Sequence, residues 1–229
     1  MIKNENYFGF RDLGFLNLGL SLSLWFMSTV ILSTAYLGPI QYYSKLKSHD
    51  SCLIEHFENF RKQTYRSRCE IYSPNGILTL SVPLIKRNQR QTVREAKISY
   101  ENDWRKLHWR SLESCYRRSP FFEYYEDDFY PYYFEKKFDF LIDLNEELQQ
   151  KILSLLKLKA DYSFTTEYKE NYEAVDSREI ISPKKDINLD PEFIQTPYWQ
   201  VFEPRHGFIP NLSIVDLLFN QGSKAAEHL

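Results

Sequence analysis

Hydrophobic and polar residues alternate on both sides of a short turn in residues 65–82. Before the turn, a strand from Tyr65 to Ile71 places Arg66 and Arg68 on the same face, roughly 6–7 Å apart by strand geometry. Residues 73–76, Ser-Pro-Asn-Gly, fit a type I turn followed by a left-handed glycine, because proline presets the second position and glycine accepts a positive φ at the fourth. The alternation resumes after the turn, so a β-hairpin is predicted at about 65–82.

An apolar strand begins at Thr29 and is followed by a bend at residues 37–39, Leu-Gly-Pro. A helix from Pro39 to about Lys47 is expected next, because the first helical turn tolerates a residue without an N–H. A second strand covers Cys52 to Glu55. This strand–helix–strand order predicts a parallel pair with a right-handed crossover, in which both strands end at the same edge of the sheet.

Three later segments have the 3.6-residue period of amphipathic helices, at 104–118, 138–158 and 214–219. A short strand is expected at 162–166, whereas the polar segments 86–94 and 168–196 are expected to be loops. The aromatic and acidic segment 121–134 is expected to be a surface that packs on the core. The chain is therefore predicted to be α/β, a single domain with a mixed, partly parallel sheet covered by helices and with a helix at its C-terminus.

Residues 1–26 differ from the rest of the chain, and the domain is expected to span 27–229. The apolar run at 14–26 is shorter than the ~20 residues that a membrane-spanning helix requires, although the uncharged window continues to Leu37. A membrane span and the apolar region of a signal peptide are two interpretations of this run. We prefer a third, an over-extended or dispensable leader, because Met27 offers a second start and an apolar strand follows at once. No stable membrane span is therefore expected.

The composition limits the class of partner. The 229 residues are enough to bury a full core, and a net charge of -2 argues against a protein whose main partner is a nucleic-acid backbone. Aromatic residues make up 17 % of the chain, which is typical either of a packed core or of rings that line a sugar or base site. The three cysteines are too few and too scattered for a disulfide framework, so a reducing, cytoplasmic location is expected.

The familiar sequence signatures of cofactor and metal sites are absent. The sequence has no GxGxxG, GxxxxGK[ST], GxSxG or HExxH motif and no CxxC pair, so neither a cofactor nor a metal is predicted. What remains is a group of polar residues expected near the carboxyl edge of the parallel pair, where open α/β sheets bind ligands. Its members are Gln41, Tyr42, Glu55, Asn59, Lys62, Arg66 and Arg68, with His108 and Arg178 added from later segments, the latter within Asp176-Ser177-Arg178 as the possible contribution of its loop.

Several cations beside a carboxylate suit an anionic small molecule such as a nucleotide sugar, since a planar guanidinium binds phosphate or carboxylate oxygens in bidentate fashion. Glu55 is a candidate general base if burial raises its pKa and the arginines leave one edge of it free. His108 is a second candidate, although a lone histidine on an apolar helix face is more often a hydrogen-bonded core residue. The alternative for the arginines is structural, with Arg66 or Arg68 paired to Glu70 or Glu55.

Six motifs spread over the chain form a recognisable set. They are TAYLGPIQYYSKL at 34–46, KQTYRSRCEI at 62–71, NGILTLSVP at 75–83, WRKLHW at 104–109, SPFFEYY at 119–125 and PNLSIVDLLFN at 210–220. Together they resemble the WbqC-like family over roughly residues 29–229, which implies that 27–229 forms a WbqC-like domain. The last motif contains Asn211 and Asp216, which join the substrate-binding candidates through this resemblance.

The resemblance also carries an expectation about function. Members of the family occur in O-antigen and other surface-polysaccharide gene clusters, which implies transfer of glycine, or another aminoacyl or acyl group, onto a sugar. Many members carry a Gln-Pro pair in the first motif and an Asn between the two arginines of the hairpin. Ser33-Thr34 and Ser67 stand at those places here, so the chain resembles a divergent member.

Two hypotheses about function follow from the residues and the resemblance. The first is a transferase that acts on a nucleotide-linked or lipid-linked sugar. In it, Arg66 and Arg68 clamp phosphate, Glu55 or His108 accepts the proton, and Gln41 with Asn59 orients the sugar. The second is a non-catalytic module that binds a polysaccharide precursor or docks onto its assembly machinery.

Overall fold

The structure is a computed structural model that describes residues 28–86 and 90–229. Its strands are β1 (Thr29–Ser33), β2 (Ser51–Glu55), β3 (Arg68–Ser73), β4 (Gly76–Ser81), β5 (Tyr162–Phe164) and β6 (Val175–Asp176). Its α-helices are α1 (Ile40–Ser48), α2 (Trp104–Tyr116), α3 (Phe122–Phe134), α4 (Leu141–Leu155), α5 (Glu203–His206) and α6 (Ile214–Gln221), and three short 3-10 helices are η1 (Val93–Glu95), η2 (Ile187–Leu189) and η3 (Gly222–His228). The predicted α/β class, hairpin and C-terminal helix are confirmed. The predicted leader at 1–26 and the choice between Met1 and Met27 as the start lie outside the described residues.

The strand–helix–strand pattern forms the predicted parallel pair, with Thr29 opposite Ser51 and Ser33 opposite Glu55. β5 pairs with β2, and β6 pairs with the other side of β1, so that the sheet has the order β5-β2-β1-β6 and is parallel throughout. The centre of β1, residues 30–32, has no exposed surface. This pattern is typical of a parallel strand covered on both faces, which is why the sequence there is a continuous apolar run.

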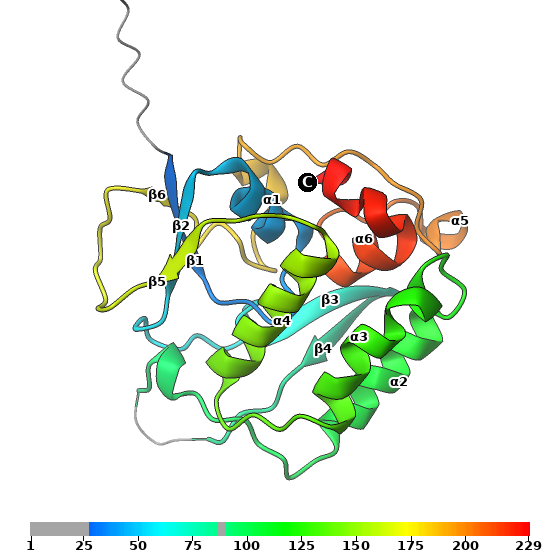
Figure 1. Cartoon of the computed structure of the whole chain (residues 1–229), viewed down its shortest axis with the longest axis horizontal. Helices are drawn as coiled ribbons and strands as arrows, with labels where there is room; N and C mark the ends of the chain where they lie inside the picture. The colour runs from blue at the N-terminus through cyan, green and yellow to red at the C-terminus, as the bar shows by residue number, and fades with distance from the viewer. Residues whose placement is uncertain (1–27, 87–89) are drawn as a thin grey trace, which may run out of the picture.

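The hairpin forms a separate two-stranded sheet of β3 and β4, beside which α2 and α3 lie (Figure 1). Its turn is as predicted, because Ser73 pairs with Gly76 and the glycine has a φ of +95°. The first strand is shorter than expected, since β3 begins only at Arg68. The carbonyl of Tyr65 accepts a hydrogen bond from the backbone N–H of Tyr36, so the chain at this point is bonded to the loop after β1. Arg66 therefore precedes the strand and does not leave it beside Arg68.

Much of the aromatic content of the chain is in the core. The ring of Phe219 on α6 lies 5.2–5.5 Å from the rings of Tyr116, Phe122 and Phe129, counted between centroids. Segment 121–134 packs on the core as expected, and it does so as helix α3. The packing of rings from three helices explains the aromatic fraction without a sugar or base site, and it favours the packed-core interpretation.

Hydrogen bonds from the first residues of α6 and its N-cap connect the hairpin to the turn before α1. The backbone N–H of Ser213 donates to the carbonyl of Glu70 on β3 at 2.8 Å, and the N–H of Ile214 donates to the carbonyl of Gly38 at 2.9 Å. The side chain of Ser213 also donates to the carbonyl of Leu37 at 2.6 Å. Backbone groups at the start of α6, which have no partner inside the helix, are thus satisfied by the two neighbouring elements.

Candidate functional site

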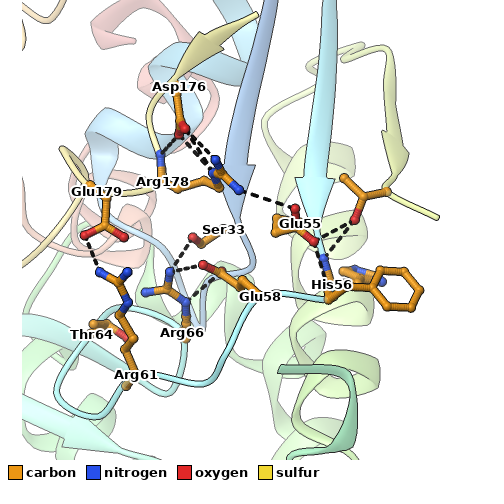
Figure 2. Close-up of polar contacts among 12 residues, drawn as sticks. Ser33, Glu55, His56, Glu58, Arg61, Thr64, Arg66, Asp176, Arg178 and Glu179 are labelled. Atoms are coloured by element: carbon orange, nitrogen blue, oxygen red, sulfur yellow. Dashed lines mark hydrogen bonds and ion pairs between the residues drawn. The ribbon is translucent and has the colours of Figure 1, made fainter. Parts of the chain in front are cut away.

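The carboxyl ends of β1, β2 and β6 bring polar groups to one edge of the parallel sheet, as expected for strands that run in the same direction (Figure 2). The chain between β2 and β3 contributes Glu58 and Arg66, and the loop after β6 contributes Arg178. We call the group the edge cluster; its members are Ser33, Glu55, Glu58, Arg66, Asp176 and Arg178. The structure therefore brings together three of the predicted site residues, Glu55, Arg66 and Arg178.

Glu55 is fully buried, and both of its carboxylate oxygens are occupied. One oxygen accepts from the backbone N–H of Phe57 at 2.7 Å and from the hydroxyl of Thr165 at 2.9 Å. The other accepts from the hydroxyl of Tyr172 at 2.9 Å and lies 3.5 Å from a guanidinium nitrogen of Arg178. Burial and the neighbouring Glu55 raise the pKa of Tyr172 to about 12, so its hydroxyl stays protonated and remains a donor. Both oxygens of Glu55 are therefore occupied by protein groups and are not open to a ligand.

Arg66 is also occupied by protein groups. Its Nε donates to one oxygen of Glu58 at 2.8 Å, and its Nη2 donates to the other at 2.5 Å, which is the bidentate geometry of a strong ion pair. The same Nη2 donates to the hydroxyl of Ser33 at 2.8 Å. Only 3 % of Arg66 and 5 % of Glu58 are exposed. The structural alternative for this arginine is thus favoured, with Glu58 as partner rather than the expected Glu55 or Glu70.

Arg178 follows β6 and holds both this strand and the loop that precedes it. Its guanidinium donates to both carboxylate oxygens of Asp176, at 2.6–3.2 Å, and to the backbone carbonyls of Lys169 and Glu170, at 3.2 and 3.0 Å. The hydrogen bonds with Asp176 raise the pKa of Arg178 further above its ordinary range. Burial acts to raise the pKa of Asp176, but the contacts with Arg178 outweigh it and the pKa is lowered. The pair is therefore a stable anchor for a loop of irregular structure.

Two cavities lie at the edge cluster. The larger, of about 210 Å³, is lined by Glu58, Asn59, Arg61, Tyr168, Glu170, Asp176, Arg178 and Glu179. The smaller holds about 10 Å³, room for one water molecule, and its wall includes Ser33, Thr34, Tyr42, Arg66 and Ser177. The larger cavity has acidic groups in excess over basic ones. Glu58, Asp176 and Glu179 are each paired with an arginine, so this excess is small, and it favours a ligand that carries an ammonium group beside any phosphate.

Gln41 and Asn211, both predicted to bind substrate, are bonded to each other. The side-chain oxygen of Asn211 accepts from the backbone N–H of Gln41 at 2.9 Å, and its Nδ2 donates to the side chain of Gln41 at 3.1 Å. Gln41 also donates to Asp190 at 2.8 Å, and Asp190 forms a buried ion pair with Lys45 at 2.9 Å. These contacts form a second polar network that shares no residue with the edge cluster.

Tyr42 and Asp216 are both buried, Tyr42 beside the smaller cavity of the edge cluster and Asp216 elsewhere in the core. The hydroxyl of Tyr42 donates to Gln149 on α4 at 2.7 Å. Asp216 accepts from the hydroxyls of Tyr116 and Tyr198, at 2.7 and 2.6 Å. Burial raises the pKa of Asp216 to about 6 in spite of these donors. Asp216 thus links α2 and α6 to the segment before α5, away from the residues of the edge cluster.

His108 lies on α2 and is 2 % exposed. Its Nδ1 is 2.9 Å from the hydroxyl of Tyr36, which is 3.0 Å from the hydroxyl of Tyr133. Burial lowers the pKa of His108 to about 4, although a hydrogen bond with the backbone of Ser81 acts in the opposite direction. The imidazole is therefore neutral near pH 7, and it contacts no residue of the edge cluster directly.

The remaining candidates are Lys62, Asn59 and the half-buried Arg68, on the hairpin and the chain that leads into it. Lys62 is exposed, and Asn59 is exposed beside the larger cavity, where its backbone forms an isolated bridge with Thr92. Arg68 lies near Glu70, whose pKa is raised by burial and held back by the Arg68 charge. Because Arg66 is bonded to Glu58 and Ser33, a phosphate clamp formed with Arg68 stays a prediction that requires Arg66 to leave these partners.

The sequence prediction missed four residues that shape the edge cluster. They are Ser33, Glu58, Thr165 and Tyr172. Ser33 and Glu58 carried a signal, since both lie at or just beyond the carboxyl end of a predicted parallel strand. Thr165 and Tyr172 carried none, because they come from the end of β5 and from a polar loop without a pattern.

Among residues 28–86 and 90–229, no group of three or more His, Cys, Asp or Glu side chains is arranged to hold a metal ion. Within the same ranges, none of the helices has the length and apolar character needed to cross a membrane.

The fold and the edge cluster define an α/β protein with a polar site at the carboxyl edge of an open parallel sheet. The model of the WbqC-like protein family matches residues 34–188, and the chain belongs to this family. A relative from Mycobacterium tuberculosis (strain ATCC 25618 / H37Rv), "Uncharacterized protein Rv1507c", is 28 % identical over 222 residues, which cover 87 % of this chain and 96 % of the relative. No solved structure matches the chain.

Proposed function

We propose that the protein is a transferase of surface-polysaccharide biosynthesis that moves an aminoacyl group from an activated donor to a nucleotide-linked or lipid-linked sugar. The WbqC-like family is associated with polysaccharide and O-antigen biosynthesis, which supports the general process. The choice of an aminoacyl group over a simple acyl group is carried by one observation. The larger cavity at the edge cluster has both acidic and basic walls, and acidic groups predominate.

An aminoacyl group carries an ammonium ion, which is attracted by carboxylates and repelled by a guanidinium. Glu179 and Arg61 lie on the wall of the cavity, where they form an exposed ion pair at 2.5 Å that a ligand can open. In our proposal, Glu179 receives the ammonium, Arg61 receives a carboxylate or phosphate of donor or acceptor, and Asn59 orients a sugar hydroxyl. Arg178 and Asp176 hold the loop that carries Glu179.

The proton acceptor is proposed to be Glu55 or His108, as the sequence predicts. For Glu55 this role requires that Tyr172 moves away, because its hydroxyl covers one carboxylate oxygen. For His108 the neutral imidazole is the correct form of a base at pH 7, but it lines the cavity at the start of α2, so this role requires a substrate that also reaches that cavity.

The experiment combines binding and product analysis. Calorimetry with single amino acids and with nucleotide sugars measures binding, and mass spectrometry of the sugar after incubation with activated amino acids measures transfer. We expect Glu179→Gln to weaken the binding of an amino acid by up to about fivefold, since an exposed ion pair is worth up to ~1 kcal/mol. Glu113→Gln removes a similar surface ion pair on α2 and is the matched control. Equal affinity of all three proteins for amino acids would contradict the proposal.

A second candidate function is a non-catalytic module that binds the same precursor. It is favoured by the burial of Glu55 and by the four contacts that occupy its carboxylate. Glu55→Gln separates the two candidates. A transferase that uses Glu55 loses turnover and keeps binding, whereas a binding module shows no turnover in either protein.

A further inference from the structure

A separate cavity lies between the outer strand of the hairpin and the start of α2. Its volume is about 400 Å³, within the roughly 300–1,000 Å³ typical of small-molecule sites. Its polar wall consists of Thr79 and Ser81 from β4, Asn102, Asp103, Trp104 and His108. None of these residues contributes to the edge cluster or lines its two cavities.

Trp104 supplies an unpaired donor at this cavity. The residue is 5 % exposed, and its indole Nε1–H is buried without a hydrogen-bond partner among the described residues. A buried donor without a partner is rare because it loses its bonds to water and gains none in return. The N–H has almost no accessible surface, so an acceptor oxygen that enters from the cavity reaches it, and removes this cost, only when the wall of the cavity moves. The exposed side chain of Leu107, which also lines the cavity, is the group that can move aside.

The other polar groups indicate the charge of the ligand. No lysine or arginine is among the described residues that line the cavity. His108 is held neutral by burial and is engaged by Tyr36 and by the backbone of Ser81. Asp103 brings a carboxylate, which repels an anion. The wall therefore offers no cationic partner to a phosphate or a carboxylate.

The same wall is well matched to hydroxyl groups. Thr79, Ser81 and Asn102 are exposed side chains that can both donate and accept hydrogen bonds, and the carboxylate of Asp103 can accept. Leu80 and Pro83 add apolar surface beside them, which suits the C–H faces of a sugar ring. We infer that this cavity binds a neutral, hydroxyl-bearing molecule of monosaccharide size, one oxygen of which accepts from the indole N–H of Trp104.

The test is a titration of the full chain followed by the indole resonances in ¹H–¹⁵N spectra. The Trp104 resonance is assigned as the one absent from Trp104→Phe. Glucose and N-acetylglucosamine are the neutral probes, and glucose 6-phosphate is the anionic probe. We expect a saturable shift of the Trp104 resonance with at least one neutral sugar at millimolar concentration. We also expect glucose 6-phosphate to bind no more tightly than glucose.

Two further variants test the cavity even if Trp104→Phe does not fold. Thr79→Val and Asn102→Ala change exposed side chains on the wall, and each should weaken the response of the Trp104 resonance at least about threefold. Arg61→Gln and Glu179→Gln change the other cavity and should leave the titration as in the unaltered chain. A linear or absent response to both neutral sugars would overturn the inference, and so would tighter binding of glucose 6-phosphate. These outcomes do not depend on transfer activity, so failure here and failure of the proposed function are distinguishable.

Discussion

The buried ion pair of the edge cluster makes a direct prediction about stability. Replacement of Arg66 by methionine removes the guanidinium and keeps a long apolar side chain in its place. The carboxylate of Glu58, which is 5 % exposed, is then left in the interior without the two hydrogen bonds that it receives from Arg66. Breaking one side of a buried pair typically costs about 3–5 kcal/mol, because the remaining charge is desolvated and uncompensated. For a chain of this size, that corresponds to a loss of roughly 10 °C in the melting temperature.

The matched control is Arg61→Met. Arg61 pairs with Glu179 at the same 2.5 Å, but the two side chains are 58 % and 61 % exposed. An exposed pair contributes about 0–1 kcal/mol, so this variant should be nearly as stable as the unaltered chain. Urea unfolding followed by circular dichroism measures the difference between the two variants.

A double variant tests the physical reason for the loss. Glu58→Leu combined with Arg66→Met removes both charges, and replacing a buried pair by apolar residues is often neutral. We therefore expect the double variant to recover much of the stability that Arg66→Met loses. If Arg66→Met costs no more than Arg61→Met, the reasoning is refuted: Glu58 would not depend on Arg66, and the guanidinium would be free to bind a ligand.

Three further predictions concern the core. Burial raises the pKa of Asp216 to about 6, so between pH 4 and 6 the folded chain holds a proton that the unfolded chain has lost. This group makes stability fall as pH rises through that window, by up to about 3 kcal/mol, and Asp216→Asn should remove this contribution in urea unfolding at pH 4 and pH 7. His108 changes the stability with pH in the opposite direction, because its pKa in the folded chain is lowered to about 4 and the unfolded chain binds the extra proton. Stability should therefore fall by up to about 3 kcal/mol as pH drops from 6.5 to 4, and a His108→Gln variant that keeps the full slope would contradict this assignment. Gly222 has a φ of +58°, and a Cβ there would lie 2.6 Å from the ring of Phe121. We expect Gly222→Ala to lose ~2–4 kcal/mol from strain and overpacking. The control Gly76→Ala, at a φ of +95° with open space around the position, should lose only about 1 kcal/mol. Equal melting temperatures of the two variants would show that the clash with Phe121 is relieved.

Local patterns in the sequence determine the parts of the fold that were predicted. The turn at Ser73 to Gly76 and the start of the first helix at Pro39 depend on backbone preferences of single residues, which act in any context. Helix α3 was missed as a helix although its buried residues have helical spacing, at 122, 125, 129, 132 and 133. Exposed rings at Tyr124, Tyr130 and Phe134 obscure that period, because they make the outer face as aromatic as the inner one.

The edge cluster was predicted only in part, since its contacts join distant segments. The position of Glu55 and Arg66 near the sheet edge follows from the order of strands. The contact between Glu55 and Tyr172 does not, because Tyr172 comes from a polar loop that pairs with β1 through the two residues of β6. An arginine that faces a ligand and an arginine that faces a glutamate have the same sequence signal, so only the three-dimensional arrangement separates a clamp from an ion pair.

Hydrogen exchange followed by mass spectrometry shows whether the cavity at the carboxyl edge of the parallel sheet binds the ligand. The full chain is compared alone and with a mixture of amino acids and nucleotide sugars. We expect slower exchange in residues 56–61 and 168–179, which contain the residues that line that cavity. Unchanged exchange in both segments with every mixture, or protection confined to other parts of the chain, would contradict this expectation.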